Sequence, residues 1–412
     1  MIEPKILKRK YDSGFEAQLI LKPGFNQRFF GIIVDFGSSD PQEVPGLAHF
    51  LEHKLFAKKE GDISQNFEEL GAEVNAFTSF NETMYYCSGV DHNSKLIELL
   101  FKLVGEPYFT KQNVEQEVPI IEQELAMYQD EPNWAITNAL MTQMFGESNL
   151  GIDVAGTKAS INQIDKKKLL AAYQTNYKPN KMHFVACGDF SENQIKTIFR
   201  LVGKLQKQYL TNSKQKKAEY QETVGLLQDI EITSDGSSNQ FGLGIRLKNF
   251  KKVLASLDLA QIILEIMLES KLSVMSPWFE RMKEEQLLNS PLQISVNYTR
   301  EGNFITLYGV SSESDKVITA IKEELAKPIT EGNKAFEKNF FELQKREWLA
   351  QSIRSMNNLS YLAVEAAEAS LDNEDTFVNV EKLQDMNFSQ FEEFCSNLLK
   401  DCQICSARLV KG

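Results

Sequence analysis

The sequence predicts an α+β protein made of two homologous domains, each a mostly antiparallel sheet packed against helices. The same order of strand-like and helix-like segments occurs twice along the 412 residues, a length that suits two domains. Neither half shows the strict strand–helix–strand alternation that is typical of a parallel sheet. Residues 204–226 are rich in Lys and Gln, have little apolar periodicity and separate the two halves.

Apolar periodicity places the elements of the first half. The runs typical of strands are residues 16–21, 29–37, 74–80 and 83–90. The runs typical of helices are a segment through residues 49–53, then 63–70, and long helices within 95–150. This order predicts a sheet of several short strands, with helices inserted between its two pairs of strands.

The second half repeats that order. Its expected strands are residues 230–233, 240–247, 292–299 and 304–310, and its expected helices are 254–272, 276–288 and those within 315–370. Short strings also recur in register, because NFEELGAEVNAF stands where WFERMKEEQLLNSPLQIS stands, and YYCSGV stands where TLYGV stands. We therefore expect a first domain over 1–205, a linker over 206–226 and a homologous second domain over 227–412.

The composition excludes several classes of protein. An excess of 57 Asp and Glu over 45 Lys and Arg argues against a nucleic-acid-binding protein. No stretch approaches 18 apolar residues, and the charged start of the chain lacks the apolar segment of a secretory signal, so we expect no membrane span. Five cysteines, an odd and ordinary number, suit reduced thiols. We therefore expect a cytoplasmic protein.

One motif indicates metal chemistry. His49 and His53 are four residues apart on a predicted helix, so their imidazoles share a face and could bind one Zn²⁺. Glu52 lies on the same side, where its carboxylate could act as a general base on water. The order H-x-x-E-H is the inverzincin signature. The alternative is that the two histidines are ordinary core or surface residues of a helix.

A zinc hydrolase needs a third protein ligand. The predicted helix EQEVPIIEQELAMYQDE offers Glu117 and Glu124, which are seven residues apart and share a face with Ile120 and Ile121 between them. Carboxylates on an apolar face are costly to bury without a partner, and a metal with its histidines would supply one. We expect Glu124 to bind the metal and Glu117 to orient a ligand or water. The alternative is a solvated acidic face.

Several segments beyond the motif resemble one family. GLAHFLEHKLF, GAEVNAFTSFNETMYY, EPYFTKQNVEQEVPIIEQEL and GTKASINQIDKKKLLAAYQTNYKPNKMHFVACGDFS are similar to the pitrilysin family of inverzincin peptidases. That family includes insulin-degrading enzyme and the mitochondrial processing peptidase. The resemblance covers the first half well and the second half weakly. It is strongest to the small bacterial members, of the type found in Bacillus.

The resemblance implies a zinc endopeptidase that cleaves small or unfolded peptides in an enclosed chamber. It implies His49, His53 and Glu124 as ligands of Zn²⁺ in the first domain, with Glu52 as general base and Glu117 as its catalytic helper. The span from His53 to Glu124 is shorter than is usual in the family, but Glu124 keeps the family's spacing from Glu117. The second domain is implied to carry no metal.

The same resemblance implies a substrate-binding strand. In the family, an edge strand pairs with the extended backbone of the substrate, which is the strand-addition mode of recognition. Asn75, Ala76 and Phe77 occupy that segment here. The alternative is that this segment is an ordinary half-buried strand.

The second half departs from the family pattern. Family members usually supply an Arg and, seven residues later, a Tyr that stabilise the developing oxyanion. In one alignment these positions hold Lys283 and Ser290, and a shifted alignment that uses Arg281 places Leu288 at the Tyr position. The nearest tyrosine is Tyr298. Neither alignment provides both residues, so this half of the active site is incomplete.

The missing pair predicts a partner. Small family members work as two-chain clamshells, and we expect this chain to be the metal-bearing subunit of a heterodimer whose homologous partner supplies the Arg/Tyr pair. A homodimer of low activity is the alternative. Two other classes stay open: a non-catalytic assembly subunit of the same fold, and a metal-dependent hydrolase that acts on something other than peptides.

The remaining candidates for chemistry have ordinary interpretations. Cys402 and Cys405 form a C-x-x-C with Cys395 before it, but no fourth ligand lies nearby. We expect these three to be small apolar residues in and near a last strand, without a functional role. His92 is expected in a solvated loop, and His183 in a strand at a layer boundary.

Overall fold

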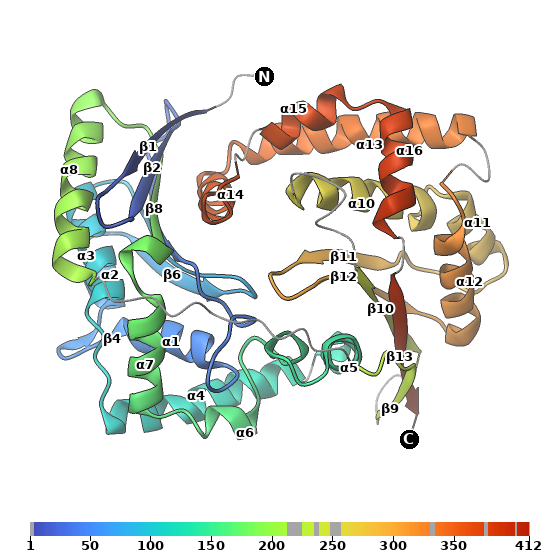
Figure 1. Cartoon of the computed structure of the whole chain (residues 1–412), viewed down its shortest axis with the longest axis horizontal. Helices are drawn as coiled ribbons and strands as arrows, with labels where there is room; N and C mark the ends of the chain where they lie inside the picture. The colour runs from blue at the N-terminus through green and yellow to red at the C-terminus, as the bar shows by residue number, and fades with distance from the viewer. Residues whose placement is uncertain are drawn as a thin grey trace. The chain divides into compact units, whose positions relative to one another are not determined.

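The structure is a computed structural model that describes residues 4–129, 131–211, 225–234, 239–247, 257–329, 334–374, 378–399 and 402–411. The chain divides into two units, each assembled from separate segments. Unit 1 consists of Met1–Leu125, Asp153–Tyr220 and Ile353–Phe377. Unit 2 consists of Ala126–Ile152, Gln221–Ser352 and Val378–Gly412. Both units are mixed sheets covered by helices (Figure 1).

Unit 1 is built on a six-stranded sheet. Its strands lie in the order β1 (Lys5–Lys10), β2 (Glu16–Leu21), β8 (Met182–Gly188), β3 (Arg28–Val34), β7 (Thr83–Gly89) and β6 (Glu73–Thr78). All neighbouring strands are antiparallel except β2 and β8. The sequence predicted β2, β3, β6 and β7. It did not predict β1, whose composition KILKRK is that of a charged edge strand.

Unit 2 contains the same sheet without the extra edge strand. Its order is β11 (Gln293–Tyr298), β12 (Asn303–Val310), β10 (Gln240–Leu247), β13 (Gln403–Lys411) and β9 (Ile230–Ser234). The only parallel pair among these described strands is β13 with β9, which corresponds to β8 with β2. The shared strand order confirms the predicted duplication and the α+β class, with mostly antiparallel sheets.

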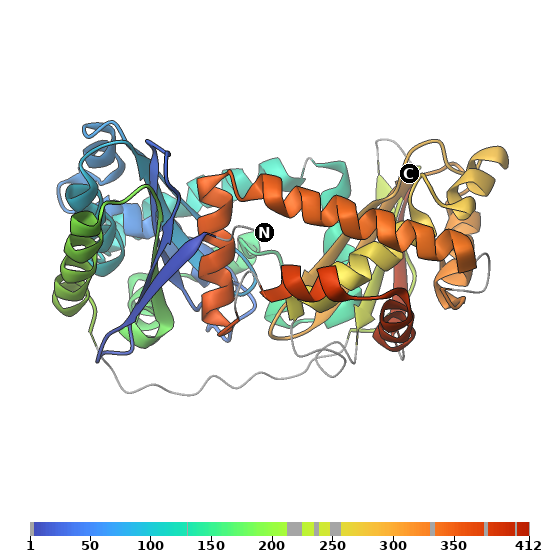
Figure 2. The same ribbon diagram turned by 90° about the horizontal axis from the view of Figure 1, so that it is seen from above.

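Two helical layers enclose the sheet of unit 1. The first contains α1 (Leu47–Phe56), α3 (Asn93–Gly105) and α8 (Glu192–Tyr209), and packs on the face that includes Phe30 and Ile32 of β3. The second is α14 (Leu359–Leu371), which packs on the opposite face, against Phe29 and Ile33. Alternate residues of β3 therefore serve opposite faces. The sheet lies between these layers in both views (Figures 1 and 2).

In unit 2 the corresponding second layer is α5 (Pro132–Phe145). The glycines of β10 allow this helix to lie close, because a Cβ atom on Gly242 would meet Ile136 at 2.6 Å and one on Gly244 would meet Met144 at 2.9 Å. The other face is covered by α10 (Leu257–Leu272), α11 (Pro277–Glu284) and α12 (Ser314–Ala326).

The two units thus take one helix each from the other half of the sequence. Helix α5 precedes the expected linker but packs in unit 2, and α14 follows it but packs in unit 1. The predicted domains 1–205 and 227–412 are each contiguous in sequence, whereas the packed units exchange these helices. The expected linker over 206–226 overlaps the end of α8 at Tyr209, and its residues 212–224 lie outside the described residues.

The remaining elements complete the two units. They are β4 (Ala57–Lys58), β5 (Gly61–Asp62), α2 (Ser64–Glu68), α4 (Lys111–Gln129), η1 (Asn149–Gly151), α6 (Lys158–Ile161), α7 (Lys166–Asn176), η2 (Pro179–Lys181), α13 (Lys334–Ser355), α15 (Val378–Asp385) and α16 (Phe388–Leu398). Among the helices described here, none is both long enough and apolar enough to cross a membrane.

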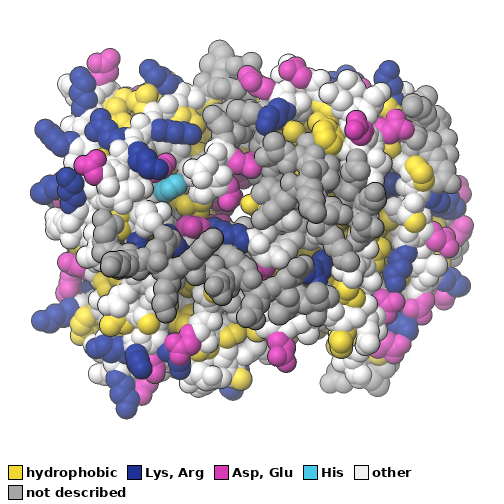
Figure 3. All heavy atoms as spheres, in the orientation of Figure 1, with side chains coloured by type: hydrophobic (Ala, Val, Ile, Leu, Met, Phe, Trp, Pro, Cys, Tyr) yellow, Lys and Arg dark blue, Asp and Glu magenta, His cyan; other side chains and the backbone are white. Residues whose placement is uncertain are grey.

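The acidic excess of the chain is not spread evenly over its surface. The exposed side of α8 carries Lys196, Arg200, Lys204 and Lys207. Lys and Arg side chains gather over α8 and the neighbouring strands in the space-filling view (Figure 3). Net charge alone therefore does not describe the local surface of unit 1.

Candidate metal centre

Helix α1 is fixed at its start by backbone packing. Gly46 precedes the helix with φ +88°, and a Cβ atom there would meet the carbonyl oxygen of Ala155 at 2.6 Å. Only glycine suits both the left-handed backbone and this close approach. The side chain of Gln42 accepts a hydrogen bond from the backbone N–H of Ala48 at 3.1 Å, which satisfies a free donor of the first turn. The helix therefore begins in one defined position.

The two histidines of α1 face a carboxylate of α4. The Nε2 atom of His49 lies 3.7 Å from Oε1 of Glu124, and Nε2 of His53 lies 3.4 Å from Oε2 of the same side chain. One ligand atom from each of the three residues can be chosen so that all lie within 4.8 Å of one another. The structure thus brings together the three residues expected to bind the metal.

Glu117 lies on the same face of α4 and contacts the other nitrogen of His53. Its Oε1 is 3.2 Å from Nδ1 of His53, so an Nδ1–H would donate to it and leave Nε2 free to face Glu124. Between the two glutamates, Ile121 is fully buried, whereas Ile120 is 53% exposed. The expectation that both isoleucines share the carboxylate face was wrong for Ile120, because one helical residue turns the side chain by about 100°.

Glu52 has a hydrogen-bond partner that the sequence did not suggest. The hydroxyl of Thr78, at the end of β6, donates to Oε2 of Glu52 at 2.6 Å. Burial raises the pKa of Glu52, and this hydrogen bond acts in the opposite direction. The carboxylate is therefore held in one orientation and has a pKa closer to neutrality than that of an exposed glutamate.

The two histidines have opposite electrostatic environments. Burial, with the neighbouring His53, lowers the pKa of His49 to about 4. Burial also lowers the pKa of His53, but hydrogen bonds to Glu117 and Glu124 outweigh it and raise the pKa to about 9. Burial likewise raises the pKa of Glu117, and hydrogen bonds from His53 and Lys54 outweigh it, so the net shift is downward. His49 is thus neutral at physiological pH, while the carboxylates of Glu117 and Glu124 favour the protonated, cationic form of His53 in the metal-free protein.

This donor set suits a zinc ion. Two imidazole nitrogens and one carboxylate are the protein ligands of many catalytic zinc sites, and they leave one position for water. Nδ1 of His49 is buried and has no hydrogen-bond partner in the described part of the chain. The nitrogen that faces the metal position is Nε2, and a neutral, buried imidazole with Nε2 directed at a carboxylate is better explained as a ligand than as a solvated surface group.

The expected substrate strand lies beside this site. Asn75, Ala76 and Phe77 belong to β6, which pairs with β7 alone among the described strands and forms an edge of the sheet. Asn75 is exposed, and the other two are half-buried. Because Thr78, the last residue of the same strand, bonds Glu52, the end of β6 lies beside the carboxylate. The geometry is compatible with an added strand.

The residues that the two alignments place at the Arg/Tyr positions all lie in unit 2. Lys283 and Ser290 are exposed, and Leu288 is fully buried in the core. Arg281 lies 3.7 Å from the carboxylate of Glu324. Tyr298 ends β11. The shifted alignment therefore places a core leucine at the position where a tyrosine would have to reach substrate.

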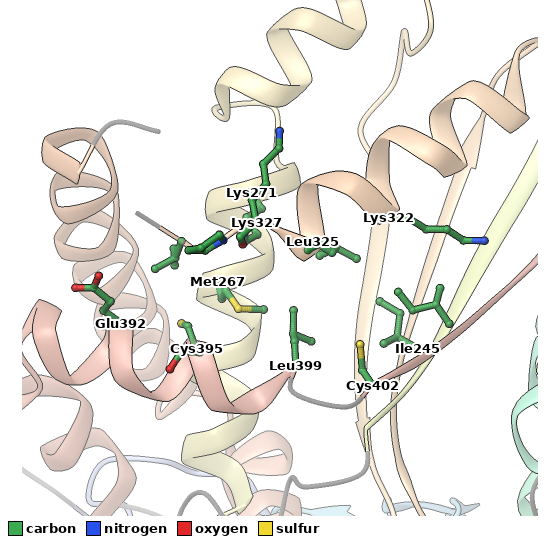
Figure 4. A pocket seen from close by; sticks show the side chains of 15 residues that line it. Ile245, Met267, Lys271, Lys322, Leu325, Lys327, Glu392, Cys395, Leu399 and Cys402 are labelled. Carbon is green, nitrogen blue, oxygen red and sulfur yellow. The ribbon is translucent and has the colours of Figure 1, made fainter. Parts of the chain in front are cut away.

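A separate cavity of about 520 Å³ lies in unit 2 between α10, α12 and α16 (Figure 4). Its lysines already have partners. Lys271 donates to the carbonyl oxygens of Glu324 and Lys327, at 2.9 and 2.8 Å. Lys322 pairs with Asp229 at 3.1 Å. None of the residues expected at the metal site lines this cavity, so it is not part of the candidate centre.

The other cysteines and histidines occupy structural positions. Cys395 and Cys402 line that cavity, Cys405 is buried in β13, and none of the five cysteines, all of which are described, forms a disulfide. His92 precedes α3 on the exposed surface. Nδ1 of His183 in β8 lies 2.7 Å from the hydroxyl of Ser370 in α14, at the predicted layer boundary.

Sequence reasoning missed three residues that shape the site: Gln42, Thr78 and Lys54. Gln42 and Thr78 lie on a loop and on a strand, and no local pattern links them to α1. Lys54 had a signal, since it follows His53 directly and lies on the side of α1 that the apolar residues mark as buried. A lysine on a buried face needs an anionic partner.

Comparison with known proteins supports the same interpretation. Residues 25–158 match the family described as Insulinase (Peptidase family M16), and residues 163–346 match the one described as Peptidase M16 inactive domain. The uncharacterized zinc protease YmfH of Bacillus subtilis is 28% identical over 375 residues, which cover 88% of this chain and 86% of that protein. These matches confirm the resemblance to the small bacterial zinc peptidases.

Two solved structures share the fold. A putative M16-like peptidase from Alicyclobacillus acidocaldarius matches with a TM-score of 0.87 at 22% identity, covering 100% of this chain and 99% of that one. A protease from Helicobacter pylori matches with a TM-score of 0.84 at 18% identity, covering 99% of this chain and 100% of the other. At these identities the likeness concerns the fold alone, and it extends over both units.

Proposed function

We propose that this chain, which belongs to peptidase family M16, hydrolyses peptide bonds at a zinc ion held by His49, His53 and Glu124. Zinc is the metal of this family, and relatives of this chain are named zinc proteases. The observation that carries the proposal is the convergence of two imidazoles and one carboxylate beside Glu52. No other group of three or more His, Cys, Asp or Glu in the described chain could hold a metal.

Glu52 is proposed as the general base. When bound, zinc polarises the scissile carbonyl and makes water more acidic. Glu52 accepts the proton of the attacking water and later gives it to the leaving amine. Burial favours this role because it raises the pKa of Glu52 towards neutrality, and the hydroxyl of Thr78 keeps the carboxylate in place. Glu117 assists by orienting His53.

The edge strand β6 is proposed to hold the substrate. An extended peptide can hydrogen-bond to the outer edge of β6 at Asn75, Ala76 and Phe77, and would then pass Glu52. A peptide must be unfolded over several residues to add to an edge in this way. We therefore propose small or unfolded peptides as substrates and an enclosed chamber as the place of cleavage.

The incomplete second half of the site supports a two-chain enzyme. In one alignment Lys283 and Ser290 stand where the family pattern has Arg and Tyr, and in the shifted alignment Arg281 and Leu288 stand there. A lysine can supply a positive charge but not the planar, bidentate donor of an arginine, and a serine is too short to replace a tyrosine. We propose that a homologous partner subunit supplies the pair. A homodimer of this chain would lack both the Arg and the Tyr donor, so we expect its activity to be low.

The test compares wild type with Glu52→Gln on a library of fluorogenic peptides, with and without the candidate partner. Both proteins should bind one zinc per chain, while Glu52→Gln should lose turnover, because the amide cannot accept the proton. Asn75→Ala, which removes an exposed side chain of β6 and frees the backbone N–H of Ala76 that this side chain accepts from at 2.8 Å, is the matched variant outside the metal ligands. It should alter KM more than kcat.

Each outcome of this test has a defined meaning. Absence of zinc from the wild type, or cleavage that survives Glu52→Gln, would exclude the peptidase mechanism. Zinc without cleavage under any condition would favour a non-catalytic assembly subunit. Full turnover by the purified chain as a homodimer would refute the partner proposal and leave the zinc site intact.

A further inference from the structure

Lys54 is a buried lysine at the metal centre. It directly follows His53 on α1, and only 4% of it is exposed. Its ammonium group lies 2.7 Å from Oε2 of Glu117. Lysine is rarely buried to this degree without a charged partner, because desolvation of the ammonium is costly. The ion pair with Glu117 therefore compensates for the burial of Lys54.

Both oxygens of Glu117 are engaged by consecutive residues of α1. Oε1 lies 3.2 Å from Nδ1 of His53, and Oε2 accepts from Lys54. Without Lys54, the carboxylate could rotate about its terminal bond and present either oxygen to His53 or to the metal position. With Lys54 in place, one oxygen is occupied and the other is directed at the imidazole.

The tautomer of His53 depends on this arrangement. Nε2 of His53 faces Glu124 at 3.4 Å and must be unprotonated to bind a metal. A hydrogen bond from Nδ1–H to a fixed carboxylate selects the tautomer that leaves Nε2 available. Lys54 fixes the carboxylate that makes this selection, although it does not touch the metal position itself.

From this geometry we infer that Lys54 is a positioning residue of the zinc site. It holds Glu117 so that Glu117 orients His53 and does not turn towards the metal. The inference rests on the proposed function, since it assumes that His53 is a zinc ligand. It adds a residue outside the H-x-x-E-H motif and assigns that residue a role through Glu117.

Two physical effects of Lys54 have opposite signs, and this makes the inference testable. The positive charge of Lys54 repels a zinc ion, so its removal should tighten zinc binding if charge alone matters. Loss of the anchor for Glu117 should weaken zinc binding, by about 10- to 100-fold if Lys54 acts as an outer-shell partner does. The sign of the change separates the two roles.

The experiment measures zinc dissociation constants by competition with a chelator for wild type and Lys54→Met. Methionine has a similar length and shape but no donor. Lys58→Met is the matched control, because Lys58 is also buried near the end of α1 but donates to the carbonyl oxygens of Leu55, Leu103 and Glu106. If Lys54→Met does not fold by circular dichroism, the shorter neutral Lys54→Gln replaces it.

A double-mutant cycle and one spectroscopic signal complete the design. If Lys54 acts through Glu117, Lys54→Met should not weaken zinc binding further in a Glu117→Gln background. In the metal-free protein labelled with ¹⁵N-histidine and held above pH 9, where His53 is neutral and carries one ring proton, the Nδ1–H signal of His53 should be present in wild type and in Lys58→Met. It should be lost or mixed with the other tautomer in Lys54→Met.

The outcomes distinguish the inference from the proposed function. Weaker zinc binding that disappears in the Glu117→Gln background, with a changed His53 signal, supports the role of Lys54. Tighter or unchanged binding, an additive cycle, or an unaltered His53 signal would overturn it. Failure of the wild type to bind zinc would instead overturn the proposed function, while the His53 signal in the metal-free protein would still report on Lys54.

Discussion

The hydroxyl of Thr78 provides the most direct test of how Glu52 is tuned. Thr78→Val removes the donor 2.6 Å from Oε2 of Glu52 and keeps the shape of the side chain. A hydrogen bond to a charged group is worth about 1.5–3 kcal/mol. Since one pKa unit corresponds to about 1.4 kcal/mol, its loss should raise the pKa of Glu52 by about one to two units.

The sign of this effect follows from the environment of Glu52. Burial already raises its pKa, and the hydrogen bond from Thr78 counteracts part of that rise. Without the bond, ionised Glu52 persists only at higher pH, so the acid limb of the kcat/KM profile should move up by about one to two pH units. On that limb kcat/KM should fall by about 10- to 100-fold, while the plateau at higher pH should change little.

The control is Thr83→Val. Thr83 lies opposite Thr78 in the β6–β7 ladder, and its hydroxyl is 3.5 Å from that of Thr78, but it donates at the shorter distance of 2.9 Å to the carbonyl oxygen of Phe36 and does not contact Glu52. This variant should leave the acid limb in place. The reasoning is refuted if Thr78→Val lowers the plateau without moving the limb, or if Thr83→Val moves the limb equally.

Three further variants test other parts of the structure. Glu124→Gln should weaken zinc binding by more than the roughly 10- to 100-fold that is typical when a residue that supports a ligand is lost. A zinc dissociation constant that changes by only a few-fold in chelator competition would contradict the role of Glu124 as a ligand. Lys58→Met leaves three carbonyl oxygens without their shared donor, so urea denaturation should show a free energy of unfolding lower by about 2–4 kcal/mol. A decrease below about 0.5 kcal/mol would show that these hydrogen bonds contribute little. Leu362→Ala, at a 3% exposed position of α14, should cost about 2–5 kcal/mol, and unchanged hydrogen exchange of β3 and β8 would argue against stabilising contact with α14.

The local sequence pattern predicted most of the fold because each half contains separate runs with the apolar period of a strand and runs with the apolar period of a helix. The runs at 16–21 and 240–247 coincide with β2 and β10. The duplication could be seen before the structure because the order of elements repeats. What the pattern could not show is that α5 and α14 pack with the opposite half. Helix periodicity reveals an apolar face but does not specify which sheet covers it.

The candidate site was more accessible from sequence than its supporting residues. His49, Glu52 and His53 share one helix, and the spacing of Glu117 and Glu124 follows the helical repeat, so both groups could be found from local spacing. The contact of Thr78 with Glu52 joins a strand to a helix across the fold, and no spacing rule predicts it. Lys54 could have been suspected from its position on a buried face, but its partner on α4 could not be identified.

The most direct test of the central claim is the zinc K-edge X-ray absorption spectrum of the purified, zinc-loaded chain. Ligation by His49, His53 and Glu124 predicts one zinc per chain, surrounded only by nitrogen and oxygen at about 2.0–2.2 Å, with the outer-shell scattering of two imidazoles. In His53→Ala one imidazole contribution should disappear. A sulfur shell at about 2.3 Å, as cysteine ligands would give, or a spectrum unchanged by His53→Ala, would contradict the assignment.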